Sequence, residues 1–408
     1  TRYAAGLDPP PARCRPLEET SLDAETAEPR HNERAQIVTD ASSSILLAAG
    51  GTGGHLFPAY ALAEELARRG RTVDLVTDMR GDRYGTGFPA RTVYRIPSAT
   101  PGSKKNPVAL ARVALTLARG AYQARTLLRT LKPAAVVGFG GYPTIPPLIA
   151  ARMLGVPAIL HEQNAVLGRA NRLLARSASA VATSFRATRY LDGPLAAKAR
   201  FTGNPVRDVV IEAAKTPFPP LTADGPVRLL VFGGSQGARF FSEAVPPALA
   251  SLPADLRHRL RLVQQARPED VATVEAATAA AGIQAEIAPF FKSLPEIMAS
   301  SHLVIARAGA SSVAELAVIG RPSILVPLPH SLDSDQLENA ANLAESGGSW
   351  CIEQKDLTPL RLATELGRLF ADPATLGAAA AKAKAEGRAD AVGLLADLVE
   401  EVAAARLA

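Results

Sequence analysis

Several features that define other classes of protein are missing from this chain of 408 residues. It has only two cysteines, Cys14 and Cys351, which excludes a disulfide framework and a cysteine-rich metal site. It has no run of eighteen or more apolar residues, as a membrane-spanning helix would need, and the N-terminus lacks the blocks of a secretory signal. We therefore expect a protein of a reducing compartment that does not span a membrane.

Acidic residues are missing from one long stretch of the chain. Between Asp82 and Glu162 there are eleven Lys and Arg residues and no Asp or Glu, although the net charge of the whole chain is only +6. A block of one sign gives part of the molecule a positive field that attracts an anionic partner, and a solvated basic face is the alternative. Because few aromatic side chains interleave with these charges, we do not expect a nucleic acid as the partner.

Signals for metal binding are also missing. The sequence has no HExxH motif, no Cys cluster and no DxD motif at the end of an apolar strand, since the DxD sequence at 333–335 lies in a Pro- and Ser-rich turn. We therefore expect neither a metal nor another cofactor. Helix N-termini and arginines would then have to stabilise any departing diphosphate.

The pattern of apolar residues divides the chain into a leader and a folded part. Residues 1–42 are rich in Pro, Ala, Glu, Asp and Arg and show no hydrophobic period, which predicts a disordered leader. From Ser44 onward, apolar runs alternate with amphipathic segments, which predicts an α/β fold with parallel sheets covered by helices on both faces. The expected strands span residues 45–49, 73–77, 134–139, 156–160, 180–183, 227–232, 260–264, 285–289, 303–306 and 323–326, and the expected first helix spans residues 58–69.

The strands fall into two series, separated by a Pro- and Gly-rich linker at 217–225. Both series open with an apolar strand followed by a glycine-rich loop, at 46–54 and at 229–237. We interpret this repetition as two Rossmann-like lobes with parallel sheets facing each other across a cleft. The predicted domains are residues 43–215 and 216–388, and a helical segment at 389–408 is expected to complete the first domain.

The two glycine-rich loops, 50–54 and 233–237, suit phosphate binding. A glycine turn between a strand and a helix lets the backbone approach a phosphate, and the helix N-terminus presents free N–H groups. Neither loop has the spacing of the dinucleotide fingerprint, and neither is followed by the Lys and Ser/Thr of a Walker motif. A tight structural turn is the alternative for each loop, but two loops at equivalent places favour two diphosphate-like ligands.

Three candidate side chains follow strands of the first lobe. His55 stands where a helix should begin, so its imidazole could take a proton from an attacking hydroxyl, or only hydrogen-bond a phosphate. Glu162, in the sequence His-Glu-Gln-Asn at 161–164, suits base catalysis or hydroxyl recognition, with a structural ion pair as the alternative. Tyr142 projects at the same edge, either into the site or as a packing residue of its rim.

Further candidates follow strands of the second lobe. Ser311 and Ser312 could cap a helix and aid phosphate binding, and Glu315, about one turn on, could accept both hydroxyls of a ribose. A capping box of Ser312 with Glu315 fits the spacing equally well. Asp335 and Gln336 precede the next helix and could bind sugar hydroxyls or cap that helix.

With these motifs in order, the chain resembles the MurG family, the UDP-N-acetylglucosamine (UDP-GlcNAc) transferases that convert undecaprenyl-diphosphoryl-N-acetylmuramoyl-pentapeptide (lipid I) into lipid II. The resemblance covers about residues 44–405 and implies a GT-B fold and an inverting, metal-independent transfer to the C4 hydroxyl of the muramoyl sugar. It also implies a peripheral protein at the cytoplasmic face of the bacterial inner membrane. It rests on GGTGGHLFP at 50–58, GGYP at 140–143, HEQN at 161–164, TGNPVR at 202–207, GGSQGA at 233–238, and the segments 307–315 and 327–342.

Carried over by position, the resemblance implies a role for each motif. UDP-GlcNAc would bind the second lobe, with its ribose on Glu315, its diphosphate near Arg207 and its uracil on the main chain at Phe291. His55 is the first choice of general base and Glu162 the second, and Tyr142 also belongs to the reacting centre. The implied donor residues are Thr52, Gly53, Asn164, Arg207, Ser235, Gln236, Phe291, Ala310, Ser311, Ser312, Glu315, Asp335 and Gln336, and Gly51, Gly54 and Gly141 are assigned to the acceptor diphosphate.

A lipid acceptor would also explain the stretch without acidic residues. Lys104, Lys105, Arg112 and Arg119 are interleaved with apolar residues at helical spacing, which favours a helix that lies on an anionic membrane surface. Two other functions stay open from the sequence. One is a UDP-GlcNAc 2-epimerase with a similar two-lobed fold, and the other is a non-catalytic regulator that binds a sugar nucleotide.

Overall fold

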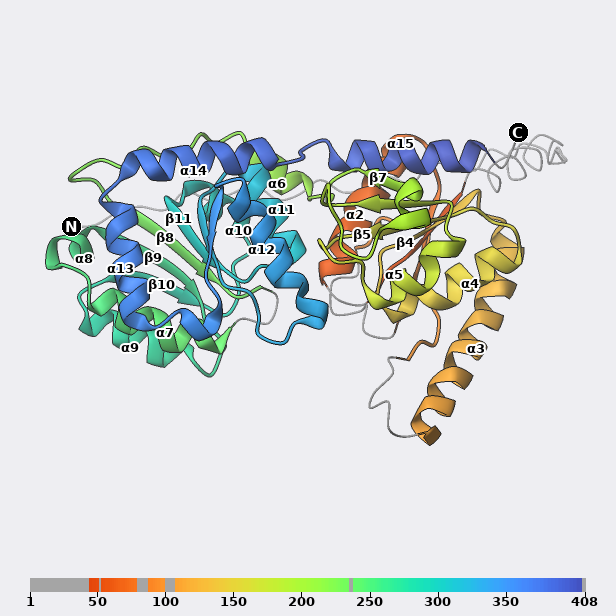
Figure 1. The fold of residues 1–408 in the computed structure, drawn as a ribbon, viewed down its shortest axis with the longest axis horizontal. Helices are drawn as coiled ribbons and strands as arrows, with labels where there is room; N and C mark the ends of the chain where they lie inside the picture. Colours follow the sequence, from red (N-terminus) through yellow and green to blue (C-terminus); the bar gives the residue numbers. More distant parts are fainter. Residues whose placement is uncertain (1–43, 51–52, 79–86, 100–106, 235–237, 406–408) are drawn as a thin grey trace, which may run out of the picture. The chain divides into compact units, whose positions relative to one another are not determined.

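The computed structural model describes residues 44–50, 53–78, 87–99, 107–234 and 238–405. The described residues belong to one compact unit and form two parallel β-sheets, each with helices on both faces (Figure 1). This confirms the predicted fold class. Among the described residues, no helix is both long and apolar enough to cross a membrane.

The first sheet has seven strands in the order β3-β2-β1-β4-β5-β6-β7, and every neighbouring pair is parallel. Its inner strand β1 is fully buried and alternates its apolar side chains between two core clusters, with Ile45 and Leu47 on one face and Leu46 and Ala48 on the other. The strands are β1 (Ile45–Ala48), β2 (Val73–Thr77), β3 (Thr92–Arg95), β4 (Ala135–Gly138), β5 (Ala158–Glu162), β6 (Ala180–Thr183) and β7 (Ala199–Phe201), and the helices are α2 (Gly53–Arg68), α3 (Pro107–Leu131), α4 (Ile145–Met153) and α5 (Arg169–Leu174).

The second sheet has six parallel strands in the order β10-β9-β8-β11-β12-β13. Its strand β8 alternates in the same way, since Leu229 and Val231 face one core cluster and Leu230 and Phe232 the other. The strands are β8 (Val227–Phe232), β9 (Leu260–Gln265), β10 (Gln284–Ala288), β11 (Leu303–Ala306), β12 (Ser323–Leu325) and β13 (Ser349–Cys351). The helices around it are α6 (Asp208–Ala213), α7 (Arg239–Ala250), α8 (Ala254–Arg259), α9 (Val271–Ala280), α10 (Leu294–Ser300), α11 (Ala310–Ile319), α12 (Asp335–Glu345), α13 (Pro359–Phe370) and α14 (Pro373–Glu386).

The sequence pattern missed three strands and misplaced the start of one helix. Strands β3, β7 and β13 are short, lie at the edges of their sheets and carry half-exposed residues, so they lack the buried apolar run that predicts a strand. The prediction that the first helix begins at Pro58 was wrong, because α2 begins at Gly53 and contains Pro58. The helix tolerates this proline with the loss of one backbone N–H donor.

Buried arginine Arg321 ties the interdomain linker to the second sheet. Its guanidinium donates to the carbonyl oxygens of Thr216 and Pro217 in the linker and of Ala299 at the end of α10. Burial lowers the pKa of Arg321 to about 10, so the side chain stays charged at neutral pH. The start of the linker is therefore held by a buried cation whose guanidinium donates to backbone carbonyl oxygens.

In two places the chain leaves one sheet and packs against the other. Val206 and Val210, ahead of the linker, pack in a core cluster of the second sheet. The last helix, α15 (Ala391–Ala404), contacts α2, and its Leu395 belongs to a core cluster of the first sheet (Figure 1). Ion pairs from Arg69 to Asp397 and Glu400 flank this contact. The chain thus crosses between the sheets twice, although the predicted domain boundaries themselves stay a prediction.

Truncation of the buried face of α15 tests its contribution to the first core. Leu395 is fully buried, so Leu395→Ala should lower the free energy of unfolding by about 2 to 5 kcal/mol, measured by urea denaturation. Leu394→Ala, on the half-buried side of the same helix, is the matched control and should cost markedly less. Equal losses for the two variants would show that α15 does not use this face to complete the core.

Candidate functional site

The candidate residues gather at the carboxyl edges of the two sheets. In a parallel sheet all strands end at the same edge, and a crevice opens where the strand order reverses. That reversal falls between β1 and β4 in the first sheet and between β8 and β11 in the second. The segments that follow these four strands carry His55 in α2, Tyr142, Gly233 and Gly234, and Ser311 in α11.

The imidazole of His55 lies against the loop that follows β4. A Cβ atom added to Gly140 or Gly141 would lie 3.4 Å from the ring of His55, and both glycines have positive φ, at 83° and 76°. A Cβ on Gly50 would lie 3.3 Å from the same ring. Because these glycines have no side chain, the loop after β1 and the loop after β4 can both approach the imidazole closely.

A chain of hydrogen bonds runs from His55 into the core of the first lobe. Nδ1 of His55 lies 3.3 Å from Oε1 of Gln163, and Nε2 of Gln163 lies 3.0 Å from Nδ1 of His161. Nε2 of His161 in turn lies 3.2 Å from the carbonyl oxygen of Gly203. Burial lowers the pKa of His161 to about 4, so this imidazole is neutral at physiological pH.

The carboxylate of Glu162 is only 2% exposed and faces its own loop. It accepts hydrogen bonds from the backbone nitrogens of Asn164 and Gly168 at 3.0 and 2.8 Å, and from the amide of Asn171 at 2.8 Å. Burial raises the pKa of this carboxyl group, and the hydrogen bonds oppose the rise. The alternative of a structural ion pair was wrong, because these partners are uncharged and no described Lys or Arg forms an ion pair with Glu162.

Gly54 directly precedes His55 in the chain, and Tyr142 follows the two glycines, 140 and 141, that lie against the imidazole of His55. Tyr142 opens the short 3-10 helix Tyr142–Thr144 and is half-buried against a core cluster of the first sheet. Gly53 and Gly54 form the first turn of α2, where the backbone N–H groups have no partner within the helix. Gly54 is exposed, so this helix start is open to a ligand.

In the second lobe, Glu315 forms an ion pair with Arg207, which lies between Val206 and Val210 where the chain passes from the first sheet to the second. Arg207 lies 3.2 Å from Oε1 of Glu315 and 4.7 Å from the centre of the Phe57 ring. Burial raises the pKa of Glu315, and Arg207 counteracts this. The capping box of Ser312 with Glu315 was wrong, since α11 is capped by Gly309 without a side-chain hydrogen bond.

The start of α11 presents a short polar surface. Ala310 is its first residue, and Ser311 and Ser312 follow in the half-buried first turn. Oγ of Ser311 is buried and has no hydrogen-bond partner among the described residues. The start of α11 therefore has backbone N–H groups with no partner inside the helix and the Ser311 hydroxyl beside them, an arrangement that suits an anion.

The loop between β12 and α12 is held by its own side chains. Oε1 of Gln336 accepts from the backbone nitrogen of Leu328 at 2.9 Å, and Oδ1 of Asp335 accepts from the nitrogen of Gln336 at 2.7 Å. The capping residue of α12 is Ser334, and it makes no side-chain cap, so Asp335 and Gln336 do not cap the helix in the usual way. Burial raises the pKa of Asp335.

Other donor candidates lie at the same edge of the second sheet. Phe291 is half-buried in the loop between β10 and α10. The nitrogen of Gly233 donates to Gln265, which also donates to the carbonyl of Pro289, so the loops after β8 and β10 are tied together. Six predicted site residues lie outside the described residues: Gly51, Thr52, Ser235, Gln236, Lys104 and Lys105.

Asn339 of α12 joins the two lobes at the site. It is fully buried, its Oδ1 accepts from the nitrogen of Ala165 at 2.8 Å, and its Nδ2 donates to Oδ1 of Asn164 and to the carbonyl of Ala308, both at 3.1 Å. Asp333 forms ion pairs with Arg169 and Arg172 nearby. Asn339 thus links the loop that carries Asn164 to the backbone just before α11.

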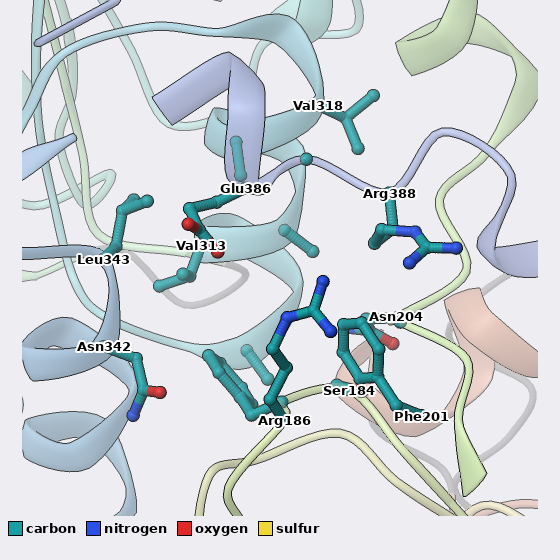
Figure 2. Close-up of a pocket in the computed structure, with 16 residues that line it drawn as sticks. Ser184, Arg186, Phe201, Asn204, Val313, Val318, Asn342, Leu343, Glu386 and Arg388 are labelled. Carbon is teal, nitrogen blue, oxygen red and sulfur yellow. The ribbon is translucent and has the colours of Figure 1, made fainter. Parts of the chain in front are cut away.

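A pocket lies to one side of this contact, along α11. Its walls come from the loops after β6 and β7, from α11 and from the segment between α14 and α15 (Figure 2). The guanidinium of Arg186 stacks 4.7 Å from the centre of the Phe201 ring, and the amide of Asn204 is buried without a partner among the described residues. Of the predicted site residues, Ala310 lines this pocket and His55 does not.

Metal binding finds no support in the part of the chain that the structure describes. No group of three or more His, Cys, Asp or Glu side chains in these residues could hold a metal ion. Two arginines near the site, Arg207 and Arg307, follow β7 and β11 in the chain. Arg307 is largely buried, and its guanidinium donates to the carbonyl oxygens of Val326 and Pro327. These hydrogen bonds hold the start of the loop that follows β12.

Comparison with known proteins supports the same architecture. The N-terminal domain of glycosyltransferase family 28 matches residues 45–183, and the C-terminal domain of that family matches residues 228–395. The chain is 57% identical over 369 residues, 90% of its length and 99% of the relative's, to the UDP-N-acetylglucosamine--N-acetylmuramyl-(pentapeptide) pyrophosphoryl-undecaprenol N-acetylglucosamine transferase of Methylobacterium sp. (strain 4-46).

Solved structures with the same arrangement include transferases and an isomerase. The crystal structure of Acinetobacter baumannii MurG is 30% identical, with a TM-score of 0.72 over 88% of this chain and 99% of that one. The UDP-GlcNAc 2-epimerase of Neisseria meningitidis has a TM-score of 0.62 over 88% of this chain and all of that one, but is only 12% identical. The second likeness shows a shared fold alone.

Acid titration tests the buried, neutral state of His161. Its pKa is lowered from 6.5 to about 4, so the unfolded chain binds this proton first and native stability falls as the pH drops below about 6.5. Between pH 6.5 and 5, the loss from this group should be about 2 kcal/mol. Glu162, with its raised pKa, acts in the opposite direction, so the comparison must be made between variants.

The matched variants are His161→Asn and His258→Asn. Urea denaturation at several pH values should show a shallower loss of stability on acidification for His161→Asn than for the wild type. His258 is exposed on α8, so its replacement should leave the slope as it is. An unchanged slope in His161→Asn would mean that this histidine is protonated in the native protein.

Proposed function

The chain belongs to glycosyltransferase family 28 and, within it, to the MurG family of N-acetylglucosamine transferases, and from this premise we propose how it acts. It transfers N-acetylglucosamine from UDP-GlcNAc to lipid I, which gives lipid II for peptidoglycan synthesis. The relatives that carry this name match the chain over nearly their whole length, at up to 57% identity. The epimerase alternative has only a likeness of fold at 12% identity.

The observation that best supports this function is the contact between the first and second lobes at the predicted site residues. The loop of residues 162–168 contacts His55 through Gln163 on one side and α12 of the second lobe through Asn164 and Asn339 on the other. A transferase has to hold a nucleotide donor and an acceptor with their reacting atoms together. The crevice between the lobes offers such a place at the helix starts of α2 and α11.

We assign the donor to the second lobe. The diphosphate would lie at the N-terminus of α11 and on Arg207, where the helix dipole and a guanidinium stabilise the charge that develops as UDP leaves. Glu315 would exchange part of its contact with Arg207 for the ribose hydroxyls. The remaining donor residues keep the roles implied by position: Thr52, Gly53, Asn164, Ser235, Gln236, Phe291, Ala310, Ser311, Ser312, Asp335 and Gln336.

We assign the acceptor to the first lobe, with His55 as the general base. The C4 hydroxyl oxygen of the muramoyl sugar attacks C1 of N-acetylglucosamine from the face opposite UDP. The bond from C1 to the diphosphate oxygen breaks, UDP leaves with the electron pair, and His55 takes the hydroxyl proton. The carboxylate of Glu162 already accepts several hydrogen bonds and suits a structural role better than that of a base. Gly51, Gly54, Gly141 and Tyr142 keep their assignment to the acceptor.

The membrane-facing surface is formed by α3 and its neighbours. Residues 108–119 of α3 include no buried side chain, and this part of the helix stands away from the sheet in Figure 1. Its exposed residues are apolar or basic: Val108, Leu110, Arg112, Leu115 and Arg119. A groove lined mainly by apolar residues of α4 and α5 lies nearby, with Met153 and Leu173 exposed at 60% and 67%. We propose that this surface rests on the anionic inner membrane at its cytoplasmic face.

A transfer assay tests the function and the base together. Labelled N-acetylglucosamine should pass from UDP-GlcNAc to a short-chain lipid I analogue with release of UDP. His55→Ala should lower turnover by about 100-fold or more with little change in KM for the donor, because general-base catalysis contributes on that scale. His258→Ala, at an exposed histidine, is the control and should act like the wild type.

Each outcome of the assay has a distinct meaning. Full turnover by His55→Ala would exclude this residue as the base while leaving the function intact. Epimerisation of UDP-GlcNAc in the absence of acceptor, without transfer in its presence, would overturn the proposed function.

Charge reversal on α3 tests the membrane surface. Arg112→Glu combined with Arg119→Glu should weaken binding to phosphatidylglycerol vesicles roughly thirtyfold or more, because each basic residue near such a surface contributes about 1 kcal/mol. Lys355→Glu combined with Arg361→Glu makes the same charge change at exposed residues beside the second sheet and should have little effect. Binding that is independent of salt, or equal for both variants, would contradict the assignment.

A further inference from the structure

The amide of Gln163 is held in one orientation by the acceptors around it. Its Nε2 lies 3.0 Å from the carbonyl oxygen of Phe139, 3.0 Å from Nδ1 of His161 and 3.2 Å from the carbonyl oxygen of His161. If the amide were flipped, Oε1 would face two carbonyl oxygens with no hydrogen between them. Because the side chain is only 2% exposed, water cannot relieve that repulsion, so the nitrogen must point into the core.

The orientation of this amide determines which nitrogen of each histidine carries the proton. Oε1 of Gln163 can only accept, so Nδ1 of His55, 3.3 Å away, has to be the donor. Conversely, Nε2 of Gln163 donates to Nδ1 of His161, whose proton then sits on Nε2 and is donated to the carbonyl oxygen of Gly203. The glutamine thus binds the two imidazoles in opposite senses: Nδ1 of His55 donates to it, whereas Nδ1 of His161 accepts from it.

We propose that Gln163 is a positioning residue that fixes the Nδ1–H tautomer of His55 and so makes Nε2 the basic nitrogen. The proposal rests on the proposed function, in which His55 takes the acceptor's hydroxyl proton. Nε2 of His55 lies beside Gly141, 3.4 Å from where a Cβ of that residue would be, on the side of the loop assigned to the acceptor. In the other tautomer Nε2 would carry a hydrogen and could not accept the proton.

The environment of Gln163 explains why an amide fits this position and an ionised carboxylate does not. A carboxylate here would place negative charge against the carbonyl oxygens of Phe139 and His161, away from water. The amide supplies donors to those oxygens and keeps an acceptor for His55. The loop itself is fixed by Glu162, whose carboxylate binds the nitrogens of Asn164 and Gly168 on either side of the turn.

Nitrogen NMR of the histidine rings tests the tautomers directly and does not depend on activity. In the wild type labelled with ¹⁵N-histidine, His55 should show the proton on Nδ1 and His161 on Nε2, with signals assigned through His55→Gln and His161→Asn. In Gln163→Met, which keeps the volume but removes the acceptor, the Nδ1–H preference of His55 should disappear. A wild-type His55 protonated on Nε2, or a tautomer unchanged in Gln163→Met, would overturn the proposal.

Steady-state kinetics test the consequence for the reaction. Gln163→Met should lower kcat at least about tenfold, within the range that general-base catalysis contributes, and leave KM for UDP-GlcNAc little changed. Gln264→Met is the matched control, because Gln264 is a buried glutamine of β9 that donates to the carbonyl of Phe241 in the second lobe. It should lose stability and keep its turnover.

The two failures are distinguishable. If wild-type protein makes no lipid II from lipid I, the proposed function fails whatever the tautomer of His55. If the wild type transfers the sugar and Gln163→Met does so at the same kcat, or Gln264→Met loses as much turnover as Gln163→Met, the positioning role of Gln163 is wrong.

Discussion

The buried carboxylate of Glu162 is the constraint on which the rest of the site depends. It lies at the end of β5, where a parallel strand delivers it to the crevice, and it binds nitrogens on both sides of the following turn. A carboxylate without a charged partner is costly to bury, so these hydrogen bonds have to stay intact for the loop to keep its shape. With the loop fixed, Gln163 points toward His55 and Asn164 toward the second lobe.

The two lobes depend on this loop in different ways. On the first lobe it supports the imidazole of His55, which the glycines at 140 and 141 bring within contact of a second loop. On the second lobe, Asn339 accepts a hydrogen bond from the backbone nitrogen of Ala165 in the same loop and donates one to the amide oxygen of Asn164. It also donates to the carbonyl oxygen of Ala308, just before α11. Ion pairs from Arg169 and Arg172 to Asp333 and from Arg189 to Glu338 add to this polar contact between the lobes.

The sequence predicted much of the fold because buried parallel strands carry a strong signal. Strands β2, β6, β8 and β11 have the residue limits that their apolar runs indicated, and the glycine loops after β1 and β8 lie at switch points as expected. The edge strands β3, β7 and β13 were missed, since sheet edges need few apolar residues. The start of α2 was misjudged because glycine and proline usually break helices, whereas here they open one beside a crevice.

The sequence predicted which residues belong to the site better than it predicted the contacts between them. Motif order placed His55, Glu162 and Glu315 near the crevice, but spacing along the chain could not show that Arg207 rather than Ser312 would reach Glu315, or that Glu162 would bind neutral groups. Gln163 was noted within the motif at 161–164 but received no role of its own, because its contacts with His55 and His161 are visible only in the folded structure.

The most direct test of a crevice that holds donor and acceptor together is a crystal structure with UDP-GlcNAc bound. The account predicts the diphosphate at the start of α11, the ribose on Glu315, and the anomeric carbon on the side that faces Nε2 of His55. A nucleotide bound elsewhere, or with its sugar turned away from His55, would contradict it.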